Sequence, residues 1–273
     1  MTTTVLKLGG ELLEDVAAMR TAADAVVRLA ASGPLVVVHG GGRAIDAELR
    51  ARGESPRFVD GLRVTDQAAL DIVVAVLAGR TNTAFVAAIG AAGGRAIGLT
   101  GADGLIGLSR RAAPLRTVSG ETADLGLVGE PIGTEASLLA DLLGARAIPV
   151  VASIGVDENG VLLNVNADVL AAHLARVLAA ERLIVAGGTA GVLDADGKTV
   201  STLPVDAIDR MTRSGVAHSG MIAKLVACRG AFGGGVRDVR IVSGRGVSDY
   251  ESASGTSLAA AAIGETPTVG TPS

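Results

Sequence analysis

The chain has 273 residues, enough for one large α/β domain or two moderate lobes, and 49% of them are hydrophobic, which predicts a sizeable core. A net charge of −4 and an aromatic content of 1% disfavour a nucleic-acid partner, which would need a broad basic face or stacking rings. A single cysteine, Cys228, excludes an internal disulfide and a cysteine-based metal cage, and suits a reducing cytosol. The first residues lack a signal-peptide pattern, and no uninterrupted apolar run approaches the ~20 residues that span a bilayer. We therefore expect a cytoplasmic protein with no membrane partner.

Short β-branched apolar runs alternate along the chain with longer segments of helical periodicity. The predicted strands are Thr4–Leu8, Leu35–Val38, Ala96–Leu99, Ile148–Ala152, Val161–Leu163, Leu183–Val185 and Val239–Val242. The predicted helices are Val16–Ala31, Ala44–Arg52, Asp66–Ala78, Asn82–Ala91, Glu135–Leu143, Val169–Ala180, Val205–Arg213 and Met221–Phe232. This alternation predicts a three-layer α/β/α sandwich with an open, mostly parallel sheet whose strands are covered on both faces.

A division of the chain is predicted near residues 178–181, between a helix and the strand Leu183–Val185. It separates an N-terminal lobe, residues 1–178, from a C-terminal lobe, residues 179–258. Residues 259–273 contain Pro, Thr, Ser and Gly, and we expect them to form a flexible tail.

Three of the predicted strands run into glycines at their carboxyl ends. The first is followed by Gly9-Gly10, the second by Gly40-Gly41-Gly42, and a later one by Gly187-Gly188 and Gly191. Ligands of open parallel sheets bind beyond this edge, and glycine lets backbone N–H groups approach an anion closely. These segments indicate either an anion site or simple tight turns.

Two nucleotide-binding motifs are excluded by their spacing. The segment from Gly191 to Thr199 resembles a P-loop, but it has one residue too many between its glycines, so we interpret it as an exposed hairpin that carries Lys198. The glycines at 40–42 do not match a dinucleotide fingerprint, because Ile45 occupies the third small-residue position. A bound nucleotide would have to be held in another way.

Lysine is rare in this sequence: of 24 basic residues, only Lys7, Lys198 and Lys224 are lysines. Lys7 lies inside an apolar strand, where an unpaired ammonium group is costly to bury, so its charged end either reaches water or faces an anion. Lys224 lies early in a predicted helix, where a cation is slightly unfavourable unless a phosphate binds there. The alternative for Lys224 is a solvated surface position.

Polar residues precede two other predicted helices. Asn164, Asn166 and Asp168 follow an apolar strand, and either cap the next helix or orient cations and a polar ligand. Arg63 is suited to bind a carboxylate through two parallel hydrogen bonds. The alternative is an arginine exposed on the surface without a ligand. The histidines show no metal-ligand spacing and no Ser/His/Asp arrangement is legible, so we expect no metal ion held by protein side chains.

Taken together, these segments resemble the amino acid kinase family, and within it the branch that acts on N-acetylglutamate. Lys-Leu-Gly-Gly at 7–10 and His-Gly-Gly-Gly at 39–42 are found across much of the family. Gly-Leu-Arg-Val-Thr-Asp at 61–66, Asn-Val-Asn-Ala-Asp at 164–168 and Ser-Gly-Met-Ile-Ala-Lys at 219–224 are more specific to that branch. The resemblance covers nearly the whole chain, to about Leu258.

The resemblance implies the amino acid kinase fold and an ATP-dependent phosphotransferase with a carboxyl group as acceptor. The reaction would transfer the γ-phosphoryl group of ATP to the side-chain carboxylate of N-acetyl-L-glutamate, an early step of arginine biosynthesis, with Mg²⁺ carried by the nucleotide. A carboxylate acceptor is ionised at neutral pH and needs no general base. The N-terminal lobe would bind the acylated amino acid and form a homodimer, and the C-terminal lobe would bind ATP.

By matching position, the resemblance also implies roles for the motif residues. Lys7 and Lys224 would stabilise the transferring phosphoryl group, and Asp168 would hold the two lysines in place. The residues implied to bind the acylated amino acid, with Arg63 on its α-carboxylate, are Gly41, Gly42, Arg63 and Asn164. The residues implied to bind the phosphates of ATP are Gly9, Gly10, Gly188 and Gly191.

The sequence departs from the family pattern at several positions. The family usually has a Ser/Thr-Asp pair near the nucleotide where Gly187-Gly188 stand here, often Pro where Ala223 stands, and often Lys where Thr83 stands. Lys7 leaves no room for the N-terminal helix of arginine-inhibited, hexameric members, so we expect an arginine-insensitive homodimer. Two alternatives stay open: a kinase for a related acylated acidic amino acid, free or carried on a small protein, and a non-catalytic sensor of the same fold.

Overall fold

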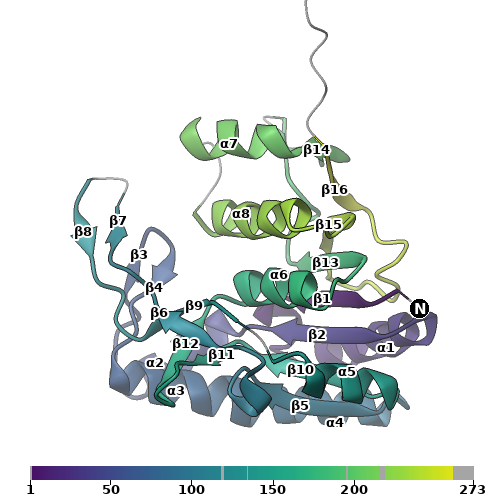
Figure 1. The fold of residues 1–273 in the computed structure, drawn as a ribbon, viewed down its shortest axis with the longest axis horizontal. Helices are drawn as coiled ribbons and strands as arrows, with labels where there is room; N and C mark the ends of the chain where they lie inside the picture. The colour runs from purple at the N-terminus through teal and green to yellow at the C-terminus, as the bar shows by residue number, and fades with distance from the viewer. Residues whose placement is uncertain (1, 118–119, 134, 195, 215–218, 261–273) are drawn as a thin grey trace, which may run out of the picture.

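An eight-stranded sheet forms the centre of the computed structural model, which describes residues 2–117, 120–133, 135–194, 196–214 and 219–260 (Figure 1). The strand order is β14-β16-β15-β13-β1-β2-β10-β5. In this order the strands are Thr202–Pro204, Gly255–Ala259, Asp238–Ser243, Arg182–Gly187, Thr4–Leu8, Leu35–His39, Ile148–Ala152 and Ala96–Thr100. Neighbours from β15 to β5 are parallel, whereas β16 runs antiparallel to β15. The sheet is therefore mostly parallel, as predicted.

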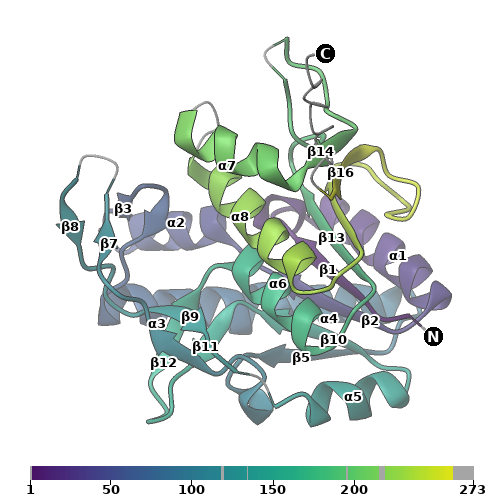
Figure 2. The same ribbon diagram turned by 45° about the horizontal axis from the view of Figure 1, so that its top comes forward.

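Helices cover both faces of this sheet, which the two views of the ribbon show (Figures 1 and 2). Successive strand residues point to opposite faces, so Val5 of β1 belongs to one core and Leu6 to the other. The core that contains Val5 includes residues of α5 (Ser137–Gly144), α6 (Ala167–Val177), α7 (Val205–Ser214) and α8 (Ser219–Gly233). The core that contains Leu6 includes residues of α1 (Val16–Ser32) and α4 (Thr83–Ala91). The predicted α/β/α sandwich is confirmed.

A long helix, Gln67–Ala91, differs from the prediction of two helices separated at residues 79–81. It consists of α3 (Gln67–Val74), a π-helical segment (Ala75–Asn82) and α4. At the end of the π-helical segment, the buried side chain of Asn82 donates a hydrogen bond to the Val150 carbonyl of β10, at 2.8 Å, which ties the helix to the sheet. By length and composition this is the one helix among the described residues that could cross a membrane. Its Phe85 and Ile89 are nevertheless fully buried in the core shared with α1.

A smaller sheet and two hairpins project from the side where β1 ends, at the left of Figure 1. The smaller sheet has the order β11-β12-β9-β6, with the bounds Ile154–Val156, Leu162–Val165, Val128–Pro131 and Ser109–Arg111. Of its strands, only the run at 161–163 was predicted. The hairpins pair β3 (Phe58–Val59) with β4 (Leu62–Arg63), and β7 (Leu115–Arg116) with β8 (Thr122–Ala123).

The remaining described helices are short and lie at the ends of strands or between them. They are α2 (Gly42–Ala51) and two 3₁₀ turns, η1 (Gly10–Leu12) and η3 (Asp103–Leu105). At the other end of the chain, β16 includes Ala259, the first residue of the predicted tail, and residues 261–273 of that tail lie outside the described residues.

Candidate active site

The glycine segments that follow β13, β1 and β2 meet at one edge of the main sheet. β1 is paired with β2 on one side and with β13 on the other. The Gly9 N–H donates to the Ala186 carbonyl at 2.8 Å, which ties the end of β1 to the end of β13. A Cβ atom at Gly10 would lie 2.5 Å from the Cα of Gly41, so a larger residue at position 10 would push the two segments apart. The sequence analysis predicted this meeting of glycines.

Two lysines that are distant in sequence meet at one carboxylate beside this edge. Lys7 Nζ lies 2.9 Å from Asp168 Oδ1, and Lys224 Nζ lies 3.5 Å from the same oxygen. Only 10% of the Lys7 and Asp168 side chains and 13% of the Lys224 side chain are exposed to solvent. The anion that faces Lys7 is therefore Asp168, and Lys224 is not a solvated surface lysine.

Local structure explains why these three side chains converge. Lys7 shares its face of β1 with Val5, so it points toward the helices α6 and α8. At the start of α6, the Asn166 side chain accepts the N–H groups of Asp168 and Val169, at 2.8 and 3.2 Å. Asn166 therefore caps the helix, and the Asp168 carboxylate is left to bind the lysines.

Burial and charge act in opposite directions on this cluster. Burial lowers the pKa of Lys7, but the Asp168 carboxylate outweighs this effect and the pKa lies above its usual value. Burial raises the pKa of Asp168, but the two ammonium groups outweigh it and hold the pKa below its usual value. For Lys224, burial and the charge of Lys7 together lower the pKa. Asp168 thus compensates only part of the positive charge of the two lysines.

Two charged residues to which the sequence analysis gave no role, Glu11 and Arg245, flank the same edge. Glu11 Oε1 accepts the Gly188 N–H at 2.6 Å. A Cβ atom at Gly188 would lie 3.3 Å from this oxygen and 3.3 Å from Arg245 Nε, so the two side chains border one small space. The sequence signal for both is weak: Glu11 directly follows a glycine pair, and Arg245 lies between two glycines at the end of a strand.

Arg63 is held by three contacts at the base of the β3–β4 hairpin. Its Nη2 donates to Asp46 Oδ1 at 2.6 Å and to the Gly42 carbonyl at 3.2 Å. The guanidinium carbon lies 4.7 Å from the centre of the Phe58 ring. Its other terminal nitrogen, Nη1, is buried and has no hydrogen-bond partner among the residues that the structure describes. An unpartnered buried donor of this kind indicates a place for an acceptor on a ligand.

The cavity beside Arg63 has a volume of about 200 Å³ and is lined by all four of the predicted acceptor-binding residues. Its polar and glycine lining residues include Gly41, Gly42, Arg63, Ser153, Asn164 and Asn166. Its apolar lining residues are Ile45, Phe58, Leu62, Leu77, Val128, Val165 and Ala167. Asn164 is oriented by a hydrogen bond from its Nδ2 to Thr65 Oγ1, at 3.0 Å. The cavity is thus mainly apolar, with a few polar groups at fixed positions.

A buried hydrogen-bond pair supports the glycine segment after β2. The Asn82 Nδ2 lies 3.0 Å from His39 Nε2, and burial lowers the pKa of His39 to about 4. His39 is therefore neutral at physiological pH, and its Nε2 can accept a hydrogen bond from Asn82. The described residues contain no group of three or more His, Cys, Asp or Glu side chains that could hold a metal ion.

Gly191 and Gly188 lie on different sides of the loop after β13. Its φ is +119°, and a Cβ atom there would lie 2.7 Å from Thr256 Oγ1 and 3.0 Å from Thr199 Cγ2. Gly191 therefore packs against β16, whereas Gly188 lies beside Glu11. Lys198, near the end of the same loop, is exposed, and its N–H donates to Asp194 Oδ1 at 2.9 Å.

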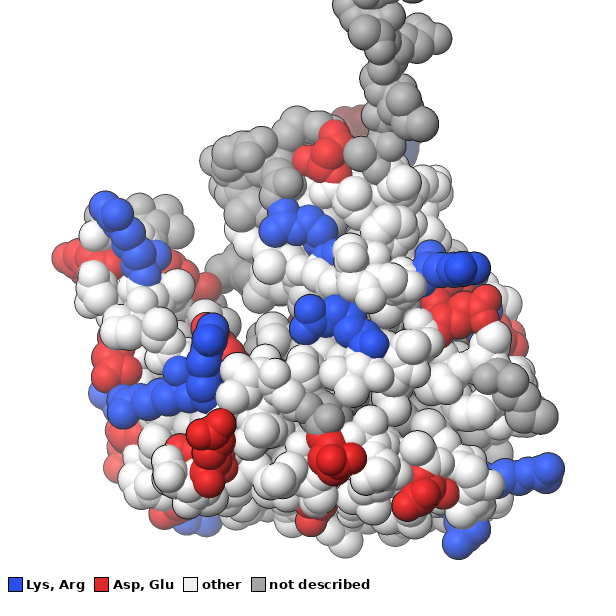
Figure 3. All heavy atoms as spheres, in the orientation of Figure 1, with Lys and Arg blue, Asp and Glu red and all other residues white. Residues whose placement is uncertain are grey.

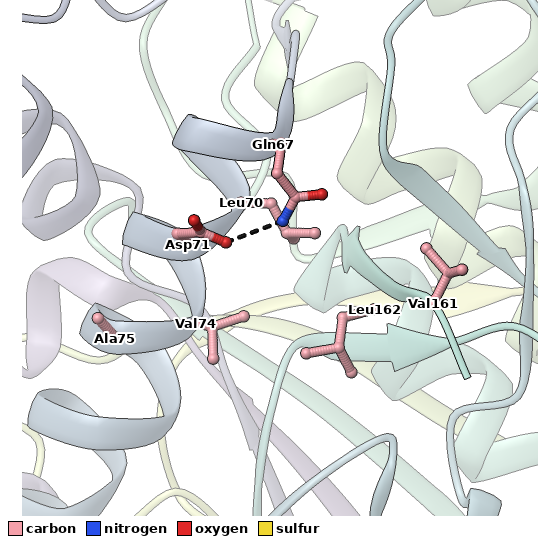
Figure 4. Close-up of a pocket in the computed structure, with 7 residues that line it drawn as sticks. All are labelled: Gln67, Leu70, Asp71, Val74, Ala75, Val161 and Leu162. Carbon is pink, nitrogen blue, oxygen red and sulfur yellow. Dashed lines mark hydrogen bonds between the residues drawn. The ribbon is translucent and has the colours of Figure 1, made fainter.

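A second cavity, of about 480 Å³, shares no residue with the cavity beside Arg63. It lies between α3 and β12 and is lined mainly by apolar side chains, as Figure 4 shows. Within it, Gln67 Nε2 donates to Asp71 Oδ1 at 2.9 Å. The residues that line this cavity include no cationic group of the kind that a phosphate would need.

Charged residues of both signs are interspersed on the face of the molecule that Figure 3 shows. Blue and red groups alternate there, with wide uncharged areas between them. A single-sign basic field, which binding along a nucleic-acid backbone requires, is not present on this face of the described residues.

The model of the amino acid kinase family matches residues 2–243. Acetylglutamate kinase of Bordetella avium is 39% identical over 245 residues, which cover 89% of this chain and 82% of that protein. Acetylglutamate kinase of Zymomonas mobilis is 41% identical over 246 residues, which cover 88% and 82%.

Solved structures share the fold. A protein of Streptococcus mutans, smu.665, has a TM-score of 0.80 at 25% identity, and the match covers 94% of this chain and 98% of that one. N-acetylglutamate synthase from Neisseria gonorrhoeae has a TM-score of 0.81 at 26% identity, with 96% and 60% covered. Carbamate kinase of Giardia, at 16% identity, has a TM-score of 0.64 and shares the fold, with 94% and 98% covered. From the family match and these relatives, this chain belongs to the amino acid kinase family.

Proposed function

We propose that the protein is an N-acetyl-L-glutamate kinase, which transfers the γ-phosphoryl group of ATP to the side-chain carboxylate of its substrate in arginine biosynthesis. The observation that carries this proposal is the meeting of Lys7 and Lys224 on Asp168, next to a cavity with a buried, unpartnered Arg63 nitrogen. The two ammonium groups suit a phosphoryl group in transfer, and the Arg63 nitrogen suits a carboxylate. The identity of 39–41% to acetylglutamate kinases supports the choice of substrate.

The cavity beside Arg63 is the proposed seat of the acylated amino acid. Arg63 Nη1 would bind the α-carboxylate, because a guanidinium group matches a carboxylate in charge and shape. Asn164, oriented by Thr65, would bind a polar group of the substrate, and Gly41 and Gly42 would let its backbone approach closely. The apolar lining residues would contact the acyl group.

The edge of the main sheet at which the glycine segments meet is the proposed binding site of the ATP phosphates. Gly188 would offer its N–H, and Gly9 and Gly10 would allow close approach, since the Gly9 N–H already donates to Ala186. Gly191 would shape the nucleotide side of the loop after β13. The nucleotide phosphates and water would supply most ligands of Mg²⁺, an ion that usually keeps several waters at such sites.

The proposed reaction is an in-line displacement. A side-chain carboxylate oxygen forms a bond to the γ-phosphorus while the bond from that phosphorus to the β,γ-bridging oxygen breaks, and ADP leaves with the electron pair. Lys7 and Lys224 offset the repulsion between the two anionic reactants and stabilise the charge that spreads over the transferring group. Asp168 acts as a positioning residue, because it holds both ammonium groups.

The proposal extends to the organisation of the molecule. Residues 1–178 would bind the acylated amino acid and form a homodimer, and residues 179–258 would bind ATP. The oligomeric state can be measured by light scattering during size-exclusion chromatography. We also propose a cytoplasmic location, which localisation of a tagged full-length chain would test.

The test is phosphorylation of N-acetylglutamate by ATP, with the acyl phosphate trapped as a hydroxamate. Lys224→Ala should lower kcat at least about a hundredfold, because one of two cations at the transferring group is lost. Lys198→Ala removes an exposed lysine and serves as the matched control, with activity near that of the unchanged protein. Near-normal turnover of the Lys224→Ala variant would contradict the assignment of this residue.

Two other functions are separated by related measurements. Activity with a larger acylated acidic amino acid, on a carrier, and none with free N-acetylglutamate, would show a sister kinase. Glu11 bonded to Gly188 favours a non-catalytic sensor as the second candidate, because the carboxylate occupies a donor that ATP would need. Calorimetry that detects N-acetylglutamate binding but no MgATP binding would support the sensor.

A further inference from the structure

The carboxylate of Glu11 lies in a space formed by three glycines from two strands. Glu11 Oε1 accepts the Gly188 N–H at 2.6 Å. A Cβ atom at Gly9 would lie 2.5 Å from both carboxylate oxygens, and one at Gly187 would lie 3.3 Å from Oε1. A side chain at position 9 would collide with the carboxylate, and one at 187 would crowd it. The carboxylate thus lies directly against the backbone at the carboxyl ends of β1 and β13.

Cationic groups surround this carboxylate. Its charge acts on both Lys7 and Lys224, where it favours the protonated ammonium form. On the other side, a Cβ atom at Gly188 would lie 3.3 Å from both Nε and Nη2 of Arg245. Arg245 is exposed and, within the described part of the chain, makes no ion pair or side-chain hydrogen bond. Three cations therefore lie near Glu11.

This arrangement has the features of an anion site that a side chain of the protein itself fills. It combines a backbone N–H donor, glycines that permit close approach, and positive charge at the end of parallel strands. Asp168 is already bound by two ammonium groups, whereas among the described residues the Glu11 carboxylate accepts one hydrogen bond, from the Gly188 N–H. Glu11 is also partly exposed, so its side chain can leave without disturbing the core.

We propose that the Glu11 carboxylate competes with a phosphate group of the nucleotide for one binding position, and that Arg245 is a third cation at that position. A nucleotide phosphate displaces the Glu11 carboxylate and takes over the Gly188 N–H. Arg245 then binds the incoming phosphate from the solvent side. This inference rests on the proposed function, because it assigns two further residues to the nucleotide half of the same site.

The displacement gives Glu11 two opposing effects. Its negative charge reduces the repulsion between Lys7 and Lys224, which share Asp168 as an ion-pair partner. When a nucleotide binds, the same charge competes with the phosphate and lowers the affinity. Glu11 therefore stabilises the empty site at a cost in nucleotide binding.

The test is calorimetry of ADP, AMP and adenosine, with and without Mg²⁺, on the full chain and on Glu11→Gln and Arg245→Gln. Glu11→Gln should bind ADP about tenfold more tightly, because a charge within a few ångströms of the phosphate is removed, and Arg245→Gln should bind it about tenfold more weakly. The affinity for adenosine should change in neither variant. Glu158→Gln and Arg237→Gln, both at exposed positions, make the same charge changes as matched controls.

The outcomes are distinct. If Glu11→Gln binds MgADP more weakly, Glu11 belongs to the magnesium or nucleotide contacts and the displacement is wrong. If Glu11→Gln changes the affinities for adenosine and ADP equally, Glu11 does not lie at a phosphate-binding position. If Arg245→Gln leaves the ADP affinity unchanged, Arg245 does not belong to the site. Absence of ADP binding in both the unchanged chain and Glu11→Gln overturns the proposed function as well. Turnover of N-acetylglutamate with unaltered ADP affinities in both variants overturns this inference alone.

Discussion

The two ends of the proposed site are built in different ways. Lys7, Asp168 and Lys224 lie on a central strand and on two helices packed over it, and their charged groups are nearly buried. Arg63 lies on a hairpin of two short strands, and its position depends on Asp46 and Phe58. The phosphoryl end is thus fixed by the core of the fold, whereas the acceptor end depends on a small element that a few contacts hold. Changes at the first end should affect both folding and turnover, and changes at the second should affect substrate affinity alone.

The largest effect is expected for Asp168→Asn, which removes the one carboxylate among the described residues that both lysines contact. Two nearly buried ammonium groups would then face each other, so we expect the free energy of unfolding at pH 7 to fall by about 3 kcal/mol. The value of kcat should fall at least about a hundredfold, because the lysines lose their positions. Urea unfolding and the hydroxamate assay measure the two effects. A variant of unchanged stability would show that the lysine cluster is not fixed by this charge.

Arg63→Lys comes next and should affect binding only. A lysine keeps the charge but loses the planar fork, so the Kd of N-acetylglutamate should rise about tenfold or more. The Kd of ADP and the midpoint of unfolding should not change. Arg57→Lys, on an exposed arginine that pairs with Asp66, is the matched control. A loss of stability in Arg63→Lys, as large as that of Asp168→Asn, would remove the distinction between the two ends.

The two ends should also differ in their dependence on pH. Burial and the charge of Lys7 place the pKa of Lys224 below the usual lysine value of 10.5, so this group loses its proton earlier than a free lysine as the pH rises. Above that pKa, kcat should fall about tenfold per pH unit. Arginine stays protonated, so the Kd of N-acetylglutamate should stay constant between about pH 8 and 10. A Lys224→Arg variant should lose the alkaline decrease in kcat; a decrease at the same pH in that variant would assign it to another group.

Asp168 should also make the free energy of unfolding depend on pH in the acid range. Its pKa lies below the usual 3.8, so the stabilisation from its pairing is complete above that pH and is lost as the pH falls through the lower value of the folded protein. Acid unfolding of Asp168→Asn should therefore be less steep than that of the unchanged chain. An equal slope would show that other carboxylates dominate acid unfolding.

The smallest effect is expected for Phe58→Leu. The change keeps an apolar side chain but removes the ring beneath the Arg63 guanidinium, an interaction of about 0.5–1 kcal/mol at a partly exposed site. The Kd of N-acetylglutamate should rise about two- to fivefold, with no change in ADP binding. An effect as large as that of Arg63→Lys would mean that the ring itself contacts the substrate.

Sequence reasoning predicted the parts of the molecule that strong local signals encode. β1 and β10 have the predicted bounds, because continuous apolar runs next to glycine or between polar turns leave little choice. The rarity of lysine drew attention to Lys7, Lys198 and Lys224, and the predicted exposed hairpin set Lys198 apart from the other two. The sequence left helix capping and cation binding as alternatives for Asn164–Asp168. In the structure both occur, because Asn166 caps α6 and Asp168 binds the lysines.

Tertiary contacts decided the features that the sequence did not predict. The strands β6, β9 and β11 of the smaller sheet are only three or four residues long, too short for a periodic signal. The helix continues through residues 79–81 in spite of Gly79, and the contact of Asn82 with the sheet is one that local sequence does not reveal. Glu11 and Arg245 are far apart in the sequence, and only the folded chain brings the loops that carry them to the same side of Gly188.

The position of β1 between β2 and β13 has a consequence for the order of folding. Its partner β2 follows within forty residues, but β13 begins at Arg182, and Lys224 is encoded later still. During synthesis, one edge of β1 must remain without its partner strand until more than half of the polypeptide has left the ribosome. Contacts of such long sequence separation slow folding and leave a strand edge open to mispairing. The cluster of Lys7, Asp168 and Lys224 is thus among the last parts to assemble.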